Sequence, residues 1–180
     1  GKTPPCVDLI IEYKLARVVF AMRDPNPKVN GIDKLKNAGI EIVEGVLEDE
    51  AAFLNRVFVK NIKTGLPYVV LKTATTMDGK IAAKTGSSKW ITSAEAREEV
   101  YRMRKEFDCI MTSSNTVIAD NPTMEHKFKC VLDRHARTSP DAKIYQQGQI
   151  HISSKPLKET LEDLYKLGVY TVFVECGGTL

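Results

Sequence analysis

The sequence predicts an α/β protein with a largely parallel sheet, and two observations lead to this expectation. Short apolar runs that are typical of strands alternate along the chain with longer amphipathic segments that are typical of helices. Glycine, proline, aspartate and asparagine separate most of these segments. At 180 residues the chain can hold one complete domain, or one domain and part of another. We place a domain boundary near Gly65, which gives a first domain over residues 1–65 and a second over 66–180.

The composition narrows the class of protein. A hydrophobic content of 43% and a mean hydropathy of −0.21 are typical of a soluble globular protein. The net charge is only +3, with basic and acidic residues interspersed, so we expect no nucleic-acid partner. No apolar run approaches the ~20 residues of a membrane helix, and no signal peptide is expected. The four cysteines are widely spaced, which favours free thiols and a cytoplasmic location.

In the first domain we expect helices over residues 7–13, 31–38 and 48–61, and strands over 17–22 and 41–44. The strand at 17–22 contains the run Val-Val-Phe, and Gly39 is suited to end the second helix. Acidic residues fill the first turn of the third helix, and apolar residues follow at helical spacing.

In the second domain we expect strands over residues 68–74, 108–113, 129–133, 150–154 and 171–176, and helices over 94–107 and 157–167. Pro67 precedes the first strand, and Thr92 or Ser93 is suited to cap the first helix. The second helix carries Leu157, Leu161 and Leu164 on one face.

The stretch from Val69 to Thr92 is the one around which the second domain is organised. An apolar run becomes polar at Lys72, and two turn signals follow, at Asp78-Gly79 and at Gly86-Ser87-Ser88. A strand that leads into polar loops and then a helix is the usual way for a sheet to build a small-molecule site. The alternative is an ordinary strand, hairpin and helix with solvated side chains.

Three strand ends are expected to converge, at residues 73–76, 112–116 and 175–179. Hydroxyl groups and glycines at strand exits suit a phosphorylated ligand, because glycine lets backbone amides approach closely. A tight turn is the commoner explanation of Gly177-Gly178 alone. In the first domain, Cys6 stands at the start of a helix, which favours a thiolate, although a small apolar residue packed under a helix would look the same.

The motif K-T-A-T-T-M-D-G-K-I-A, followed by S-K-W-I-T and an Ala-Arg helix, resembles the reductase domain of the bifunctional riboflavin-biosynthesis deaminase–reductases. G-K-T-P-P-C-V-D-L-I-I resembles the segment that supplies the last zinc thiolate in cytidine-type deaminases. The resemblance implies the C-terminal half of a cytidine-deaminase-like three-layer domain over 1–65. It implies a dihydrofolate-reductase-like domain, truncated at its C-terminus, over 66–180.

The resemblance also implies an activity in riboflavin biosynthesis. NADPH would reduce the ribosyl group of 5-amino-6-(5-phosphoribosylamino)uracil to ribityl, and the intact parent would also deaminate a pyrimidine with zinc. The zinc site is incomplete in this sequence, because the His-x-Glu and first Pro-Cys elements are absent. A homo-oligomer is implied as well. Two alternatives stay open, a reductase of a pteridine-like substrate and a non-catalytic binding module.

The resemblance assigns residues to each role. Lys72 and Glu175 are the candidates for polarising the substrate or relaying a proton. The residues on the cofactor side are Ala74, Trp90, Thr116, Asp120, Arg134, Gly177, Gly178, Thr179 and Leu180. The residues on the substrate side are Ser88, Arg104, Met124, Lys127 and Glu175. Cys6 is the implied zinc ligand.

Ordinary alternatives exist for several of these residues. Arg134 is suited to a 2′-phosphate, but a solvated arginine at a strand end is equally consistent with the sequence. Trp90 is consistent with a core aromatic, Lys72 with a solvated lysine, and Glu175 with a strand-end acid paired with a lysine.

The sequence departs from the family pattern at three places. Lys127 stands where the family usually has arginine, Met124 where it has leucine, and Ser113-Ser114-Asn115 where glycines are common. Near Asn30-Gly31 and between Met124 and Lys129 the chain is shorter than the family pattern. The serines and Asn115 are expected to reshape the phosphate pocket of the cofactor.

Overall fold

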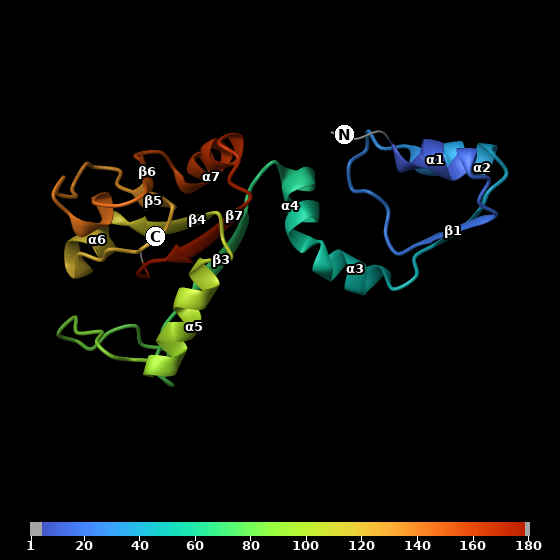
Figure 1. Cartoon of the computed structure of the whole chain (residues 1–180). Helices are drawn as coiled ribbons and strands as arrows, with labels where there is room; N and C mark the ends of the chain where they lie inside the picture. The colour runs from blue at the N-terminus through green and yellow to red at the C-terminus, as the bar shows by residue number, and fades with distance from the viewer. Residues whose placement is uncertain (1–4, 179–180) are drawn as a thin grey trace. The chain divides into compact units, whose positions relative to one another are not determined.

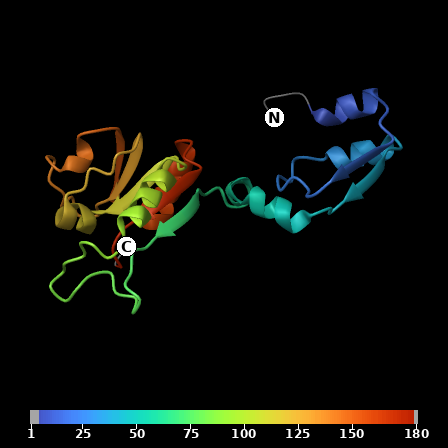
Figure 2. The same ribbon diagram turned by 60° about the horizontal axis from the view of Figure 1, so that its bottom comes forward.

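The computed structural model describes residues 5–178, and the chain divides into two compact units, residues 1–64 and 65–180. Figures 1 and 2 show the elements of each unit along the chain. The first unit contains α1 (Cys6–Glu12), β1 (Arg17–Phe20), α2 (Gly31–Asn37), β2 (Glu41–Glu44), α3 (Glu48–Leu54) and α4 (Arg56–Thr64). The second contains β3 (Tyr68–Lys72), α5 (Ala94–Arg104), β4 (Cys109–Ser113), α6 (Ser114–Asp120), β5 (Phe128–Leu132), η1 (Lys143–Tyr145), β6 (Gln149–Ser153), α7 (Leu157–Lys166) and β7 (Thr171–Glu175).

In the first unit β1 and β2 form a two-stranded parallel sheet that ion pairs reinforce. Arg17 pairs with Glu41 at 2.7 Å, and Arg23 holds Glu44 through two nitrogens at 2.7 and 2.9 Å. These pairs are exposed to solvent, which screens them, so each contributes little to stability.

The single helix expected over residues 48–61 is wrong, because the helix breaks at Asn55. The Asn55 side chain donates a hydrogen bond to the Ala51 carbonyl at 2.9 Å, and the Asn55 backbone N–H donates to the same oxygen at 3.0 Å. A side-chain amide that competes for a helix carbonyl offers the backbone an alternative to the helix. The chain therefore ends α3 and starts α4 again at Arg56.

Over residues 65–178 the second unit has five strands, which form one parallel sheet in the order β3-β7-β4-β5-β6 and confirm the expected architecture (Figure 1). The last strand, β7, lies between β3 and β4, with Tyr68 opposite Thr171 on one side and Ile110 opposite Phe173 on the other. Strands that run in the same direction bring their carboxyl ends to one edge. Lys72, Glu175 and Ser113 therefore end at the same edge of the sheet.

Each face of this sheet has its own apolar cluster. On one face α7 contributes Leu164, and on the other face α6 contributes Val117. The first cluster contains Cys109, Met111, Cys130, Leu164, Val169, Val172 and Val174. The second contains Ile110, Val117, Met124, Val131, Ala142 and Ile144. Burial raises the pKa of the Cys130 thiol to about 12, so this thiol is an inert part of the core.

The helix α6 was not expected, since the sequence indicated only a polar exit after β4. Ser113 caps this helix, and its hydroxyl accepts a hydrogen bond from the Thr116 backbone N–H at 3.5 Å. Asn, Thr, Val and Ile are weak helix formers, so nothing in the composition of residues 114–120 indicated a helix. A serine cap and tertiary packing of Val117 override this low propensity.

A lysine side chain is buried on the face of the sheet that carries the second apolar cluster. Lys129 is only 1% exposed, and its Nζ donates hydrogen bonds to the carbonyl oxygens of Ile144 and Thr123 at 2.5 and 3.2 Å. These two carbonyls belong to η1 and to the segment that precedes β5. Burial lowers the pKa of Lys129 below its ordinary value. The ammonium thus ties two loop segments to the middle of the sheet.

Asp133 organises the turn that follows β5. Its carboxylate accepts hydrogen bonds from the backbone N–H groups of Arg137 and Thr138, both at 2.9 Å, and from the Thr138 hydroxyl at 2.7 Å. Burial alone would raise the pKa of Asp133, but these hydrogen bonds and the Arg137 charge outweigh burial, so the pKa lies below its ordinary value.

We expect Asp133→Asn to lower the free energy of unfolding by about 1.5–3 kcal/mol at neutral pH, since hydrogen bonds to a charged acceptor are lost. A lowered native pKa means that this stabilisation is present above the ordinary value of 3.8 and is lost as the pH falls through the native pKa. Thermal unfolding of both proteins across the acidic range measures the effect. A difference between wild type and variant that stays constant below pH 3.8 would contradict this account.

Candidate functional site

A buried carboxylate between two cations forms the centre of the carboxyl edge. Glu175 ends β7 directly opposite Lys72 of β3 in the parallel register. Arg104, at the end of α5, holds both oxygens of this carboxylate, with Nε to Oε1 at 2.5 Å and Nη2 to Oε2 at 3.0 Å. The Lys72 ammonium lies 3.7 Å from Oε2. The three side chains together carry one net positive charge.

The three side chains differ in access to solvent. The side chain of Glu175 is 8% exposed and that of Arg104 is 15% exposed, whereas that of Lys72 is 28% exposed. The backbone carbonyl of Glu175 also accepts a hydrogen bond at 2.7 Å from the buried hydroxyl of Thr112. Lys72 is therefore the member of the cluster that a bound molecule contacts most easily, with Glu175 and Arg104 behind it.

The ion pair with Glu175 limits how Arg104 can contact a substrate phosphate, which is the role expected of it. Two of its nitrogens already bind Glu175 in a bidentate geometry, and its guanidinium carbon lies 5.0 Å from the centre of the Tyr101 ring. A phosphate at this position would have to share the guanidinium with Glu175. For Glu175 itself, the structure shows the buried, paired carboxylate that the sequence left as one of two alternatives.

The loop over residues 73–93 borders the same edge. Its first turn forms around Thr76, whose hydroxyl contacts the Asp78 carboxylate and accepts from the Lys80 backbone N–H. Both figures show the loop extending beyond the sheet, between β3 and α5. A side-chain carbon at Gly178 would lie 3.8 Å from the Ile81 side chain, so the loop passes beside the end of β7. Ala74 and Ser88 are half-buried in this loop.

Trp90 lies in the same loop and is not a core aromatic, because 71% of it is exposed. Arg97 of α5 places its guanidinium carbon 4.2 Å from the centre of the Trp90 ring. The same guanidinium donates to the Thr92 carbonyl at 2.6 Å. Sequence reasoning missed Arg97, although the Ala-Arg pair at the start of α5 was part of the motif.

Other expected cofactor residues lie around β4 and β5. Thr116 is half-buried in the first turn of α6, next to Ser113, and Asp120 is exposed at the opposite end of this helix. Arg134 is exposed at the carboxyl end of β5, in the turn that Asp133 organises. Gly177 and Gly178 are exposed after β7. Thr179 and Leu180 lie outside the described residues.

Lys127 does not join the other expected substrate residues. It directly precedes β5 and therefore lies at the amino edge of the sheet, about 17 Å along the strand from the carboxyl edge. His126 fixes this position, since its ring contacts the carbonyls of Phe107 and Phe128 at 3.0 and 2.8 Å. Met124 is buried in the second apolar cluster beside Ile110 and Val131. The structure therefore does not bring Lys127 or Met124 to the cluster around Glu175, where the substrate was expected.

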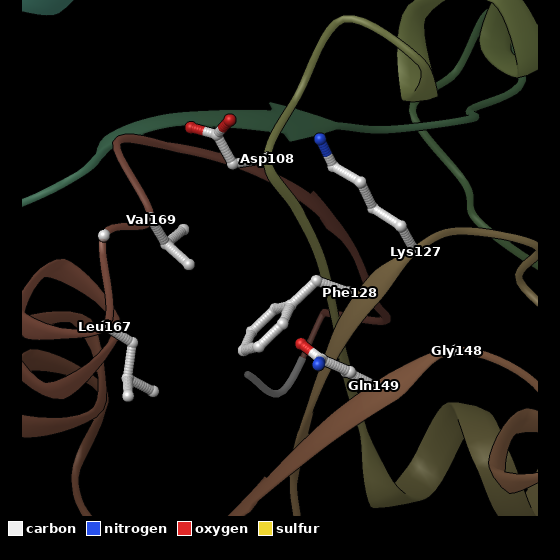
Figure 3. A pocket seen from close by; sticks show the side chains of 8 residues that line it. Asp108, Lys127, Phe128, Gly148, Gln149, Leu167 and Val169 are labelled. Atoms are coloured by element: carbon white, nitrogen blue, oxygen red, sulfur yellow. The ribbon is translucent and has the colours of Figure 1, made fainter.

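Lys127 instead lines an open pocket of about 650 Å³ at the amino edge. Figure 3 shows the Phe128 ring directed toward Leu167 and Val169, with Asp108 and Lys127 at one end. The Asp108 carboxylate accepts from the backbone N–H groups of Tyr170 and Thr171 at 3.0 Å. This pocket is thus separate from the cluster around Glu175.

In the first unit Cys6 is exposed at the start of α1. Within residues 5–178, no group of three or more His, Cys, Asp and Glu side chains is arranged to hold a metal ion. Across the same residues, no helix has the length and apolar character needed to cross a membrane.

Comparison with known proteins places these observations in a family context. A family model described as the RibD C-terminal domain matches residues 67–180. The chain is 39% identical over 187 residues to the riboflavin biosynthesis protein RibD of Aquifex aeolicus, covering 97% of the chain and 52% of that protein. It is 40% identical over 157 residues to RibD of Escherichia coli, covering 86% of the chain and 43% of that protein. The chain thus spans about half the length of these relatives.

Solved structures show the same similarity. A diaminohydroxyphosphoribosylaminopyrimidine deaminase/5-amino-6-(5-phosphoribosylamino)uracil reductase from Thermotoga maritima matches with a TM-score of 0.82 at 34% identity, covering 99% of the chain and 58% of that structure. RibD from Acinetobacter baumannii matches with a TM-score of 0.80 at 36% identity, covering 99% and 60%. These similarities confirm the expected α/β architecture, with a dihydrofolate-reductase-like second unit.

Proposed function

The chain belongs to the RibD C-terminal domain family, and from this premise we propose that its second unit is an NADPH-dependent reductase of riboflavin biosynthesis. The substrate is 5-amino-6-(5-phosphoribosylamino)uracil, and the product carries a ribityl chain in place of the ribosyl group. The main structural support for the proposal is that the Glu175 carboxylate is held between Lys72 and Arg104 at the carboxyl edge of the parallel sheet.

The residues around this edge suit a dinucleotide. A side-chain carbon at Gly177 would meet nothing within 4 Å, so the backbone after β7 is open to a phosphate group. The exposed indole of Trp90 and the exposed guanidinium of Arg134 offer a stacking surface and a cation. NADPH, when bound, supplies the hydride.

The reduction requires a group that polarises the sugar or delivers a proton, and a site that holds this group in position. The reduction adds a hydride to C1 of the ribosyl group, breaks the bond between C1 and the ring oxygen, and adds a proton to that oxygen. Lys72 is the accessible ammonium of the cluster, so we assign to it the polarisation of the sugar or the delivery of that proton. The negative charge of Glu175 holds the Lys72 ammonium in place, and Arg104 in turn fixes Glu175.

The first unit is proposed to be part of the zinc deaminase domain of the parent protein. The supporting observations are the sequence pattern around Cys6 and the similarity to a structure whose name includes both activities. Cys6 would be one ligand of that zinc ion. The four free cysteines agree with the cytoplasmic location that we propose, and the homo-oligomer implied by the family resemblance is proposed as well.

The test is an assay of substrate-dependent NADPH oxidation by the full-length parent protein, with the deaminated pyrimidine riboside as substrate. We expect Lys72→Ala to lower kcat by about 100-fold, as loss of a positioned proton donor typically does. Lys105→Ala, which changes an exposed lysine after α5, is the matched control and should keep the activity. A folded protein with bound zinc that oxidises no NADPH would overturn the proposal. Oxidation with a dihydropteridine alone would favour the pteridine alternative.

A further inference from the structure

The structure contains a stacked pair in which one partner, Arg97, has none of the expected roles. The guanidinium of Arg97 lies over one face of the Trp90 indole, with 4.2 Å between its carbon and the ring centre. Its Nη1 also donates a hydrogen bond to the Thr92 carbonyl at 2.6 Å. Arg97 is half-buried in the first turns of α5, whereas Trp90 is 71% exposed. The Arg97 side chain, which belongs to α5, therefore contacts the loop at two residues, Trp90 and Thr92.

Helix capping does not account for this arrangement. Ser93 already caps α5, since its hydroxyl accepts from the Ala96 backbone N–H at 3.2 Å. The Arg97 guanidinium instead reaches back across the cap to the loop. Its planar shape lets it stack and donate a hydrogen bond at the same time, which a lysine ammonium cannot do.

The exposure of the Trp90 indole indicates that the stacked pair leaves a surface on which a planar ring can bind. The guanidinium covers one face of the ring, and most of the remaining indole surface is open to solvent. The loop that carries Trp90 also passes beside Gly178, the residue position three after β7, through the Ile81 side chain. Planar heteroaromatic rings bind to such faces by stacking, and an exposed aromatic on a polar loop has no packing role of its own.

We propose that Arg97 is a positioning residue that holds Trp90 ready to stack against a heteroaromatic ring of the nicotinamide cofactor. This inference rests on the proposed reductase function. The cofactor has two such rings, adenine and nicotinamide, and both offer the flat surface that the indole requires. Arg97 does not touch the reacting atoms, so its contribution is to the binding of the cofactor.

Trp90 is the only tryptophan of the chain, so intrinsic fluorescence reports directly on this stack. In the ligand-free chain, Arg97→Lys should shift the Trp90 emission and make the indole more accessible to acrylamide. Arg102→Lys changes an exposed arginine on the same helix and is the matched control, for which the emission should not change. Equal melting temperatures of the two variants would show that the shift is local.

Binding of NADPH, followed by quenching of Trp90, then tests the role. Arg97→Lys should raise the Kd of NADPH by about threefold to tenfold, the size of effect expected of a lost cation–π contact. When NADPH's own fluorescence is followed in a Trp90→Leu background, the same substitution should have no further effect. Competition by 2′,5′-ADP or by nicotinamide mononucleotide assigns the stacked ring: the fragment whose affinity depends on Arg97 carries it.

The outcomes separate this inference from the proposed function. NADPH binding that is equal in wild type and Arg97→Lys, or fragment affinities that are both insensitive to Arg97, would overturn the role of Arg97 and leave the reductase proposal standing. Absence of NADPH binding by the wild-type full-length parent protein would overturn both.

Discussion

Replacing Glu175 with alanine should lower the free energy of unfolding of the second unit by about 3–5 kcal/mol, because it leaves two cations without their partner in a mostly buried site. Arg104 and Lys72 both direct their charge at this carboxylate, at 2.5 and 3.7 Å. Chemical denaturation followed by the fluorescence of Trp90 and the tyrosines measures the change. We also expect a fall in kcat of about 100-fold or more, because Lys72 loses its positioning group.

The chain offers a matched control for this prediction. Glu99 binds Arg102 with an equally close contact of 2.6 Å, but the two side chains are 51% and 66% exposed. Glu99→Ala should therefore lower the free energy of unfolding far less than Glu175→Ala does. If Glu99→Ala and Glu175→Ala lower the free energy of unfolding by the same amount, burial of the Glu175 cluster does not explain its contribution to stability.

Glu175→Gln separates geometry from charge at this site. The amide has nearly the same shape but carries no charge, so it retains packing and loses the attraction to both cations. We expect most of the activity to be lost and a smaller part of the stability. Activity near that of wild type would show that the charge of Glu175 is not needed by Lys72.

The second large effect is expected at Lys129. Lys129→Ala removes the donor from two carbonyl oxygens, those of Thr123 and Ile144, and leaves a cavity in the sheet layer. A buried acceptor left without a partner costs about 1–3 kcal/mol, and the cavity adds to this cost. We therefore expect a loss of about 3–5 kcal/mol in the free energy of unfolding, measured in urea at neutral pH. Lys143→Ala, on the exposed side of η1, serves as the control and should change stability by less than about 1 kcal/mol.

The pH dependence of stability gives an independent test of Lys129. Burial lowers its native pKa, so between that value and the ordinary 10.5 the unfolded chain binds more protons than the native protein. Stability contributed by this group therefore rises as the pH increases through that window. Relative to Lys129→Met, which keeps the length of the side chain without the charge, wild type should gain stability toward alkaline pH. Parallel pH profiles of the two proteins would mean that the ammonium titrates normally.

Strands were predictable from this sequence and some helices were not, for a physical reason. Each strand of the second unit is an apolar run next to a turn signal, and the observed strands β4 and β7 lie within one residue of the expected limits. The helix α6 depends on the Ser113 cap and on tertiary packing, and the break at Asn55 depends on a single side-chain hydrogen bond. Neither has a periodic signal.

The sequence indicated where strand ends converge, but not which side chains contact each other there. The family resemblance made Lys72 and Glu175 the candidates for polarising the substrate, and the sheet order makes these two residues direct neighbours. The place of Lys127 depends on which edge its segment returns to, and that is fixed by the His126 contacts with Phe107 and Phe128. Pairing of Arg97 with Trp90 depends on loop geometry that no spacing rule encodes.

The position of β7 has a consequence for how the chain reaches this fold. β3 is hydrogen-bonded only to β7 among the described strands, and Tyr68 pairs with Thr171 across most of the unit's sequence. During synthesis β3 and β4 therefore emerge with no bond between them, and the sheet stays split until residues 171–175 insert. Contacts of such long sequence separation slow folding, since the ordering of the chain precedes the gain from pairing. The strand that joins β3 to β4 also carries Glu175, so the cluster of Lys72, Arg104 and Glu175 forms only after β7 has inserted.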